Sequence, residues 1–221
     1  MLWVGRFGIA NGEAQQDTPW LGIYQDPKPS EESSDIYALV YPALPGSEEF
    51  CGEMKDAIGE SFHKQKASLT GGMLRALQGA HENLRDWNRR SLKDHRVAAG
   101  VSCVAAQGNL AHLAQVGPAA AVFYHRGEVR MLSPRLPGSM APLGLEEEFW
   151  PEFWRFEMED GDRLLLLSPD LAALLPDEEL TRILKMSGED ALPALYERAS
   201  SLDDCGALLV AALPDDLDIG A

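Results

Sequence analysis

After His95, apolar side chains recur at every second position, which is the period of β-strands. The segment VAAGVSCVAAQGNLAHLAQVG contains two candidate strands around a turn at Gln107–Asn109, and AAAVFYHRGEVRMLS contains two more around His125–Gly127. Because short turns join antiparallel neighbours, we expect these four strands to form an antiparallel meander. This region rules out a purely helical bundle, and the remaining elements must pack against a sheet.

Helical periodicity is found before and after this region. Between residues 47 and 65, apolar side chains lie four positions apart, at Phe50, Met54, Ile58 and Phe62. The segment LTGGMLRALQGAHENLRDWNRR continues this period for longer, so we expect the longest helix of the chain to start near Thr70. Two short helices are expected at about Asp177–Met186 and Glu189–Ala199.

Further strands lie outside the meander. IYALVY (Ile36–Tyr41) is a short apolar strand that ends at Pro42, and CGALLVAAL (Cys205–Leu213) is the last strand. WRFEMEDGDRLLLLS predicts a hairpin, or at least two strands, around Glu159–Gly161. The stretch Pro19–Asp35 is rich in proline, serine and acids, and we expect a turn or an exposed loop there.

This order of elements predicts an α+β protein in which helices cover mostly antiparallel sheet. The number of strands favours two stacked antiparallel β-sheets, flanked by helices on both sides, over one open sheet. A length of 221 residues fits a single domain over residues 1–221. Residues 214–221 are expected to form a flexible tail.

The composition argues against several partners and compartments. The chain has 35 acidic and 19 basic residues, a net charge of −16, which argues against nucleic acid and against an anionic membrane as partners. No stretch approaches the ~20 apolar residues that span a bilayer, and MLWVGRFGIANGE lacks the pattern of a secretory signal. The three cysteines lie far apart in apolar segments, which favours buried thiols. We therefore expect a cytoplasmic protein, and the composition indicates a bacterial one.

Four segments carry a resemblance to a known family: LTGGMLRALQGAHENLRDWNRR, LAHLAQVGPAAAVFYHRGEVRML, GDRLLLLSPDLAALLPDEEL and SLDDCGALLVAAL. Together they resemble the metal-dependent, type-2C serine/threonine protein phosphatases, in the order of that family and from about Ile36 to Leu213. The resemblance implies an α-β-β-α sandwich, in agreement with the periodicity. It also implies two divalent ions, manganese or magnesium, held by carboxylates, and a bridging water that attacks a phosphoserine or phosphothreonine.

The chain departs from this family at its metal-binding motifs. The first motif is Asp-Gly at the end of a strand, and Pro42 and Ala43 occupy its two positions here. The second motif is Ser-Asp-Gly, which here is Ser168-Pro169-Asp170. Because proline has no side-chain oxygen, it cannot be a metal ligand, and two carboxylates of the resembled centre are missing.

Three acids remain as residual metal candidates. The third motif of the family is Asp-Asn, here Asp203-Asp204, and Asp17 is the counterpart of an acidic residue near the family's N-terminus. Asp203 is equally explained as a cap or loop carboxylate, and Asp170 either replaces a missing ligand or simply opens a helical turn. These acids are too few to hold two ions tightly, so no cofactor is expected, and manganese or magnesium belongs only to an arrangement with rearranged ligands.

The segment EEEFWPEFWRFEM is unusually aromatic. Core packing or a covering flap is its simplest explanation. Trp150 and Trp154 are also candidates for a partner surface, since clustered aromatic side chains often anchor interfaces. No catalytic residue is assigned, because the histidines form no pair at metal-ligand spacing and Ser168 lacks a Gly-x-Ser-x-Gly setting.

Three functions are compatible with these residues. The favoured hypothesis is a catalytically inactive phosphatase-like domain that acts in phosphorylation signalling by binding a protein, either a phosphoprotein or a kinase. The alternatives are an active metal-dependent serine/threonine phosphatase with rearranged ligands, and a purely structural or scaffold domain. The losses at Pro42 and Pro169 favour the first hypothesis, since two ligand positions have gone in the same chain.

Overall fold

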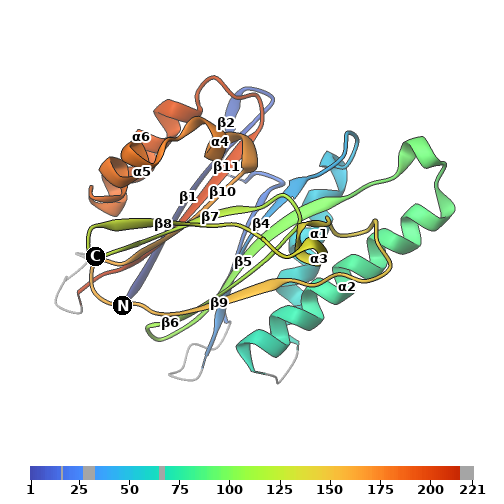
Figure 1. The fold of residues 1–221 in the computed structure, drawn as a ribbon, viewed down its shortest axis with the longest axis horizontal. Coiled ribbons are helices and arrows are strands. Elements are labelled where there is room, and N and C mark those ends of the chain that lie inside the picture. Colours follow the sequence, from blue (N-terminus) through green and yellow to red (C-terminus); the bar gives the residue numbers. More distant parts are fainter. Residues whose placement is uncertain (16, 27–32, 65–67, 215–221) are drawn as a thin grey trace.

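The computed structural model describes residues 1–15, 17–26, 33–64 and 68–214. They form two antiparallel sheets stacked face to face, with helices on both outer faces, which is the predicted fold class (Figure 1). No helix among the described residues has the length and apolar character needed to cross a membrane. The flexible tail expected at 214–221 lies, apart from Pro214, outside the described residues.

The strand order of the first sheet, as far as the chain is described, is β2-β1-β11-β10-β7-β8. Its strands are β1 (Leu2–Ala10), β2 (Glu13–Gln15), β7 (Ala120–His125), β8 (Glu128–Leu132), β10 (Arg163–Leu167) and β11 (Cys205–Ala212). The order of the second sheet is β3-β4-β5-β6-β9. Its strands are β3 (Leu21–Tyr24), β4 (Asp35–Pro42), β5 (Ala99–Gln107), β6 (Leu110–Val116) and β9 (Glu152–Glu157).

Each outer face carries its own helices (Figure 1). Those on the second sheet are α1 (Glu48–His63) and α2 (Leu69–Arg90), and those on the first are α4 (Pro169–Leu174), α5 (Asp177–Leu184) and α6 (Gly188–Ala199). The connections contain α3 (Pro137–Met140) and a 3-10 turn, η1 (Lys93–His95). The long helix starts at Leu69, one residue before the expected Thr70, because the Ser68 side chain accepts a hydrogen bond from the Gly71 N–H.

The run Leu164–Leu167 shows how the layers are held together. Leu164 and Leu166 face the core between the two sheets, whereas Leu165 and Leu167 face α4, α5 and α6. All four side chains are completely buried. A strand whose two faces are both covered has no polar alternation, which explains the continuous apolar run.

Two segments without a predicted strand contribute to the sheets. The N-terminal strand β1 pairs with β11 in an antiparallel register that begins at Leu2 opposite Ala212. The stretch Pro19–Asp35, expected as an exposed loop, contains the edge strand β3, and its Trp20 is buried. Residues 27–32 of that stretch lie outside the described residues. Long-range pairing therefore makes strands where the local composition favours a loop.

The predicted meander is wrong, although all four of its strands exist. β5 pairs with β6 in the second sheet, and β7 pairs with β8 in the first, so β6 and β7 belong to different sheets. The chain crosses at Gly117, which has a left-handed φ of +72° and donates its N–H to Ser139 O at 2.7 Å. A short turn followed by a strand with an apolar period of two looks the same in the sequence whether the second strand pairs with the first or crosses to the other sheet. The sequence therefore could not distinguish the two.

The hairpin predicted around Glu159–Gly161 is wrong for the same reason. β9 pairs with β6 in the second sheet, whereas β10 pairs with β7 and β11 in the first. The turn at Glu159–Gly161 is therefore a second crossing between the layers. Both strands were expected, and only their pairing differs.

The crossing at Gly117 generates a prediction about Gly100. A Cβ added to Gly100 would lie 2.0 Å from the carbonyl oxygen of Pro118, so the crossing chain passes directly over this residue. We expect Gly100→Ala to lower the free energy of unfolding by about 1–3 kcal/mol, measured by urea denaturation. Gly79→Ala is the control: a Cβ there meets nothing within 4 Å, and the helix should gain up to about 1 kcal/mol. Equal stability of the Gly100 variant and the wild type would contradict this account of the crossing.

Candidate functional site

The end of β4, the start of α4 and the turn before β11 meet at one place, where Tyr41 connects them. The Tyr41 hydroxyl donates to Asp170 Oδ2 at 2.5 Å and lies 3.3 Å from the backbone oxygen of Asp204. Tyr41 precedes Pro42, and Asp170 follows Pro169. The segments that contain Pro42, Pro169 and Asp204 therefore converge at one end of the sheets.

Both prolines occupy positions where a missing N–H is tolerated. The Ala43 N–H donates to Ala98 O at 2.8 Å, so in the adjacent pair of Pro42 and Ala99 the backbone N–H positions point away from each other. Pro42 consequently removes no bond between β4 and β5. Pro169 is at the start of α4, where an α-helix leaves its N–H groups unpaired in any case.

The residues before and after Pro169 connect the start of α4 to β11 and to β4. Ser168 donates its N–H to Gly206 O at 2.9 Å, and its Oγ accepts from the Gly206 N–H at 3.3 Å. Ser168 is completely buried, and both of these bonds hold it against β11. Asp170 lies in the first turn of α4, as the helix-opening explanation expected, and also accepts the Tyr41 hydrogen bond.

The aspartates before β11 are engaged by the turn between β1 and β2. The N–H of Gly12 donates to the Asp203 carbonyl at 2.8 Å, and the N–H of Asn11 donates to Asp204 Oδ1 at 3.0 Å. Asn11 has a left-handed φ of +55°, which asparagine tolerates. Asp204 thus supports a turn, and it is Asp204 rather than Asp203 that lies beside Tyr41.

Asp17, the remaining residual candidate, has a different partner. Its carboxylate lies 3.5 Å from the guanidinium of Arg6, and its side chain is 88% exposed. Arg6 in turn donates to the Leu21 carbonyl on β3. An exposed ion pair of this kind contributes little to stability. These contacts give Asp17 a role at the junction of β1 and β3.

The Tyr41 hydroxyl and the Cys205 thiol are held in their neutral forms. Burial, followed by the hydrogen bond to Asp170, raises the pKa of the Tyr41 hydroxyl well above its usual value. Burial raises the pKa of the Cys205 thiol to about 11, so this group is protonated at neutral pH. Cys205, Cys51 and Cys103 are buried free thiols, as predicted. The site therefore offers neither a tyrosinate nor a thiolate as nucleophile.

Tyr41 was not singled out from the sequence. Its neighbour Pro42 carries the motif change, and nothing in the local sequence indicates that the preceding side chain reaches a residue far along the chain. Trp20, from the stretch expected to be a loop, packs beneath it with ring centres 5.9 Å apart. A bulky aromatic residue directly before the altered motif is the only available signal.

The two tryptophans proposed as a partner surface lie in different environments. Trp150 is 61% exposed, whereas Trp154 is partly buried against the core between the sheets. Side chains alternate along β9, so Phe153, at 37% exposed, points to the α2 side of the sheet instead. The expectation for Trp154 is therefore corrected: it packs in the interior, and Phe153 takes its place beside Trp150.

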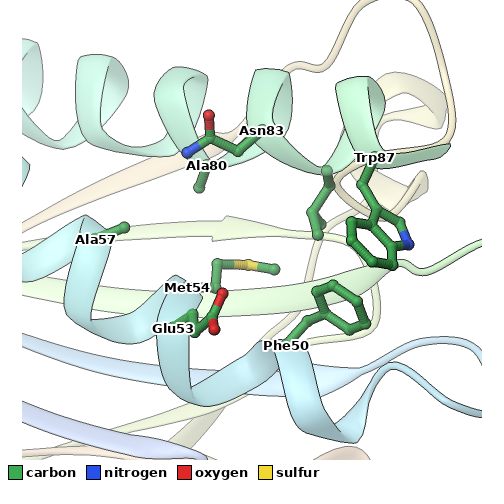
Figure 2. Close-up of a pocket in the computed structure, with 8 residues that line it drawn as sticks. Phe50, Glu53, Met54, Ala57, Ala80, Asn83 and Trp87 are labelled. Atoms are coloured by element: carbon green, nitrogen blue, oxygen red, sulfur yellow. The ribbon is translucent and has the colours of Figure 1, made fainter. Parts of the chain in front are cut away.

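Trp150 and Phe153 line a groove of about 420 Å³ between α2 and residues 147–153, which we call the α2–β9 groove. A smaller hollow of about 240 Å³ lies on the other flank of α2, between α1 and α2 (Figure 2). There, the rings of Phe50 and Trp87 meet edge to face with centres 4.9 Å apart. Apolar side chains dominate this hollow, which suits packing rather than hydrolysis.

Several solved structures of bacterial phosphatases are similar to this fold. Stp1 of Staphylococcus aureus has a TM-score of 0.75 at 13% identity, with 97% of this chain and 96% of that chain covered. PppA of Pseudomonas aeruginosa has a TM-score of 0.74 at 16% identity, with 96% and 98% covered. The catalytic domain of the serine/threonine phosphatase PstP, in complex with two manganese ions, has a TM-score of 0.72 at 14% identity, with 96% and 99% covered. The chain has the fold of these phosphatases. No family model and no curated protein sequence matches it.

The residues at the Tyr41 site do not fit a two-metal centre. Pro42, Ala43 and Pro169 have no side-chain oxygen, and the neighbouring carboxylates of Asp170 and Asp204 already accept hydrogen bonds from Tyr41 and Asn11. Within the described ranges, no group of three or more histidine, cysteine, aspartate or glutamate side chains is arranged to hold a metal ion. Two divalent ions close together need several such oxygen ligands.

The hydrogen bond from Tyr41 to Asp170 can be tested by a double-mutant cycle. We expect Tyr41→Phe and Asp170→Ala to show a coupling energy of about 1 kcal/mol in urea denaturation, because the first change removes the donor and the second removes the acceptor of the same bond. The matched cycle of Tyr41→Phe with Asp203→Ala should show coupling below about 0.5 kcal/mol. Coupling that is equal in the two cycles would contradict the specific pairing.

Proposed function

We propose that this chain is a serine/threonine phosphatase-like domain that has lost two-metal catalysis and acts by binding a protein in phosphorylation signalling. The observation that carries the proposal is that Pro42 and Ala43, which have no side-chain oxygen, stand at the end of β4, where the resemblance expects the first metal motif. At that strand end, a tyrosine joins the surrounding segments by a hydrogen bond. In this proposal, the fold is retained while the carboxylates that metal chemistry needs are replaced.

The physical argument concerns charge. In a two-metal hydrolysis site, carboxylates offset the concentrated positive charge, and the ions generate the attacking hydroxide. Pro42 and Pro169 bring neither charge nor oxygen to this place. Tyr41, held neutral by burial and by Asp170, supplies no compensating anion at neutral pH. This chain's own residues therefore provide positioning hydrogen bonds but no group suited to activating water.

The alternative is an active metal-dependent serine/threonine phosphatase with rearranged ligands, which would use manganese or magnesium. One observation favours it: Asp170 and Asp204 both lie beside Tyr41, so two carboxylate-bearing residues remain at the strand ends. Asp203 and Asp17 are the other residual candidates. Against this alternative, the Asp17 carboxylate pairs with Arg6, and the Asp204 carboxylate accepts the Asn11 N–H.

A phosphatase fold that does not hydrolyse phosphate can still act by binding a protein partner. PppA, one of the structures with this fold, is described as a key regulatory component of a type VI secretion system, which supports a signalling context. The partner is a phosphoprotein or a kinase in this proposal, since those are the proteins that a phosphatase fold meets. We retain the bacterial cytoplasm as the expected compartment, in keeping with the buried free thiols.

The loss of catalysis is tested by incubating the purified protein with manganese or magnesium and a phosphoserine or phosphothreonine peptide. We expect no phosphate release above the metal-only background, because the positions of two ligands hold proline. Sustained turnover that a chelator abolishes would contradict the proposal and establish the alternative. An active bacterial phosphatase of the same fold serves as the positive control for the assay.

A second test restores the missing ligands. We expect Pro42→Asp with Ala43→Gly and Pro169→Asp to raise manganese affinity at least about tenfold, measured by calorimetry, because carboxylates return to two converging strand ends. The matched control is Pro42→Asn with Ala43→Gly and Pro169→Asn, which has the same shape without the charge. Two tight manganese sites in the wild-type protein, or equal affinities of both variants, would contradict this view of the site.

A further inference from the structure

The α2–β9 groove is an apolar channel on the surface of the second sheet. Its apolar side chains include Leu74 of α2, at 42% exposed, together with Phe149, Trp150 and Phe153. α2 contacts β5 and β6, and β9 is the edge strand of the sheet next to β6, so the groove lies along the edge of the region that α2 covers. Exposed aromatic side chains gathered in one groove are characteristic of docking surfaces.

The wall of the groove opposite α2 is held in place by side chains of the helix. His81 Nδ1 accepts from the Gly144 N–H at 3.2 Å, and the His81 ring stacks on Phe149 with centres 4.7 Å apart. One turn further along, Arg85 donates to the Glu147 carbonyl at 3.0 Å, and Asn88 donates to the Gly144 carbonyl at 2.8 Å. A surface that is already ordered loses less conformational entropy when a partner binds.

Trp150 rests against α3 on one side. A Cβ added to Gly138 would lie 2.6 Å from Cδ1 of Trp150, so one side of the indole rests against the backbone of α3 while the other side remains open. A large aromatic side chain that is held at one edge and exposed at the other can contribute binding energy without first having to be ordered.

The charges around the groove define what it can receive. Its lining includes three acids, Glu82, Glu147 and Glu148, and one base, Arg85, whose guanidinium is bound to a backbone carbonyl. Apolar side chains bordered by acidic ones favour a segment whose apolar side chains are bordered by basic ones. A phosphorylated side chain would be repelled at this place.

We infer that the α2–β9 groove docks a basic segment of a partner protein, which places apolar side chains against Trp150 and Phe153 and lysines or arginines beside the glutamates. This inference rests on the proposed function, since it supplies the surface by which the domain binds. A second copy of the chain is a poor occupant: in a two-fold interface the same acids would face each other, on a chain of net charge −16.

The test uses a fluorescein-labelled model peptide of about 15 residues, in which leucine and phenylalanine at helical spacing are flanked by lysine. Its binding to the full chain is followed by fluorescence anisotropy at physiological salt. We expect saturable binding that Trp150→Ala or Phe153→Ala weakens at least about tenfold. The matched control is Leu92→Ser, which removes an exposed apolar side chain from outside the groove and should change the Kd less than about twofold.

Charge is tested in the same assay. Glu148→Lys should weaken binding severalfold, whereas Glu197→Lys, which makes the same change of charge on α6, should not. A peptide in which phosphoserine replaces two of the flanking lysines should bind more weakly than the original peptide. Circular dichroism melting of each variant verifies that it is folded before its Kd is compared.

Several outcomes would overturn the inference. The first is absence of peptide binding, and the second is equal loss of binding in the groove variants and in their controls, which indicates attraction by net charge alone. The third is a dimer in sedimentation experiments that Trp150→Ala dissociates, which assigns the groove to a second copy. Each of these leaves the proposed loss of catalysis standing, because that is decided by phosphate release.

Discussion

Burial of the central strands on both faces is the constraint on which this architecture depends. Leu164–Leu167 alternates between the inter-sheet core and the helices α4, α5 and α6, with all four side chains excluded from water. Such a strand is stable only if a second sheet covers one face and helices cover the other. Once the sheets are stacked, the ends of β4, β10 and β11 arrive at the same place, and that convergence creates the site around Tyr41.

In the resembled family, carboxylates that bind metal ions are expected at the place where this chain has the hydrogen bond from Tyr41 to Asp170. Metal ions can hold facing strand ends together by neutralising the repulsion between their carboxylates. Here the prolines reduce that repulsion, and the Tyr41 hydroxyl joins β4 of one sheet to the start of α4 on the other. A buried, neutral phenol and its short bond to Asp170 therefore connect these segments.

The groove beside Trp150 is built from other elements than the Tyr41 site. It depends on α2 and on residues 147–153, whereas the site uses β4, α4 and the turn before β11. A change at one does not remove side chains from the other. A phosphatase-like domain can consequently lose its hydrolytic groups and keep, or acquire, a surface for binding. The acidic border of the groove is consistent with the overall charge of the chain, which the sequence shows directly.

The sequence by itself determined the long helices, most of the strands, the two-sheet class and the absence of side-chain oxygens at Pro42 and Pro169, because periodicity and side-chain chemistry are local properties. It did not indicate β1, which becomes a strand by pairing with β11. Only the tertiary structure decided which strands pair, since an apolar period of two is the same for a hairpin and for a crossing between sheets at Gly117. It also separated Trp150 from Trp154, whose places on opposite faces depend on which face of β9 is covered. The hydrogen bond of Tyr41 could not be predicted from the local sequence, because its partner Asp170 lies 129 positions away and the two side chains meet only when both sheets have formed.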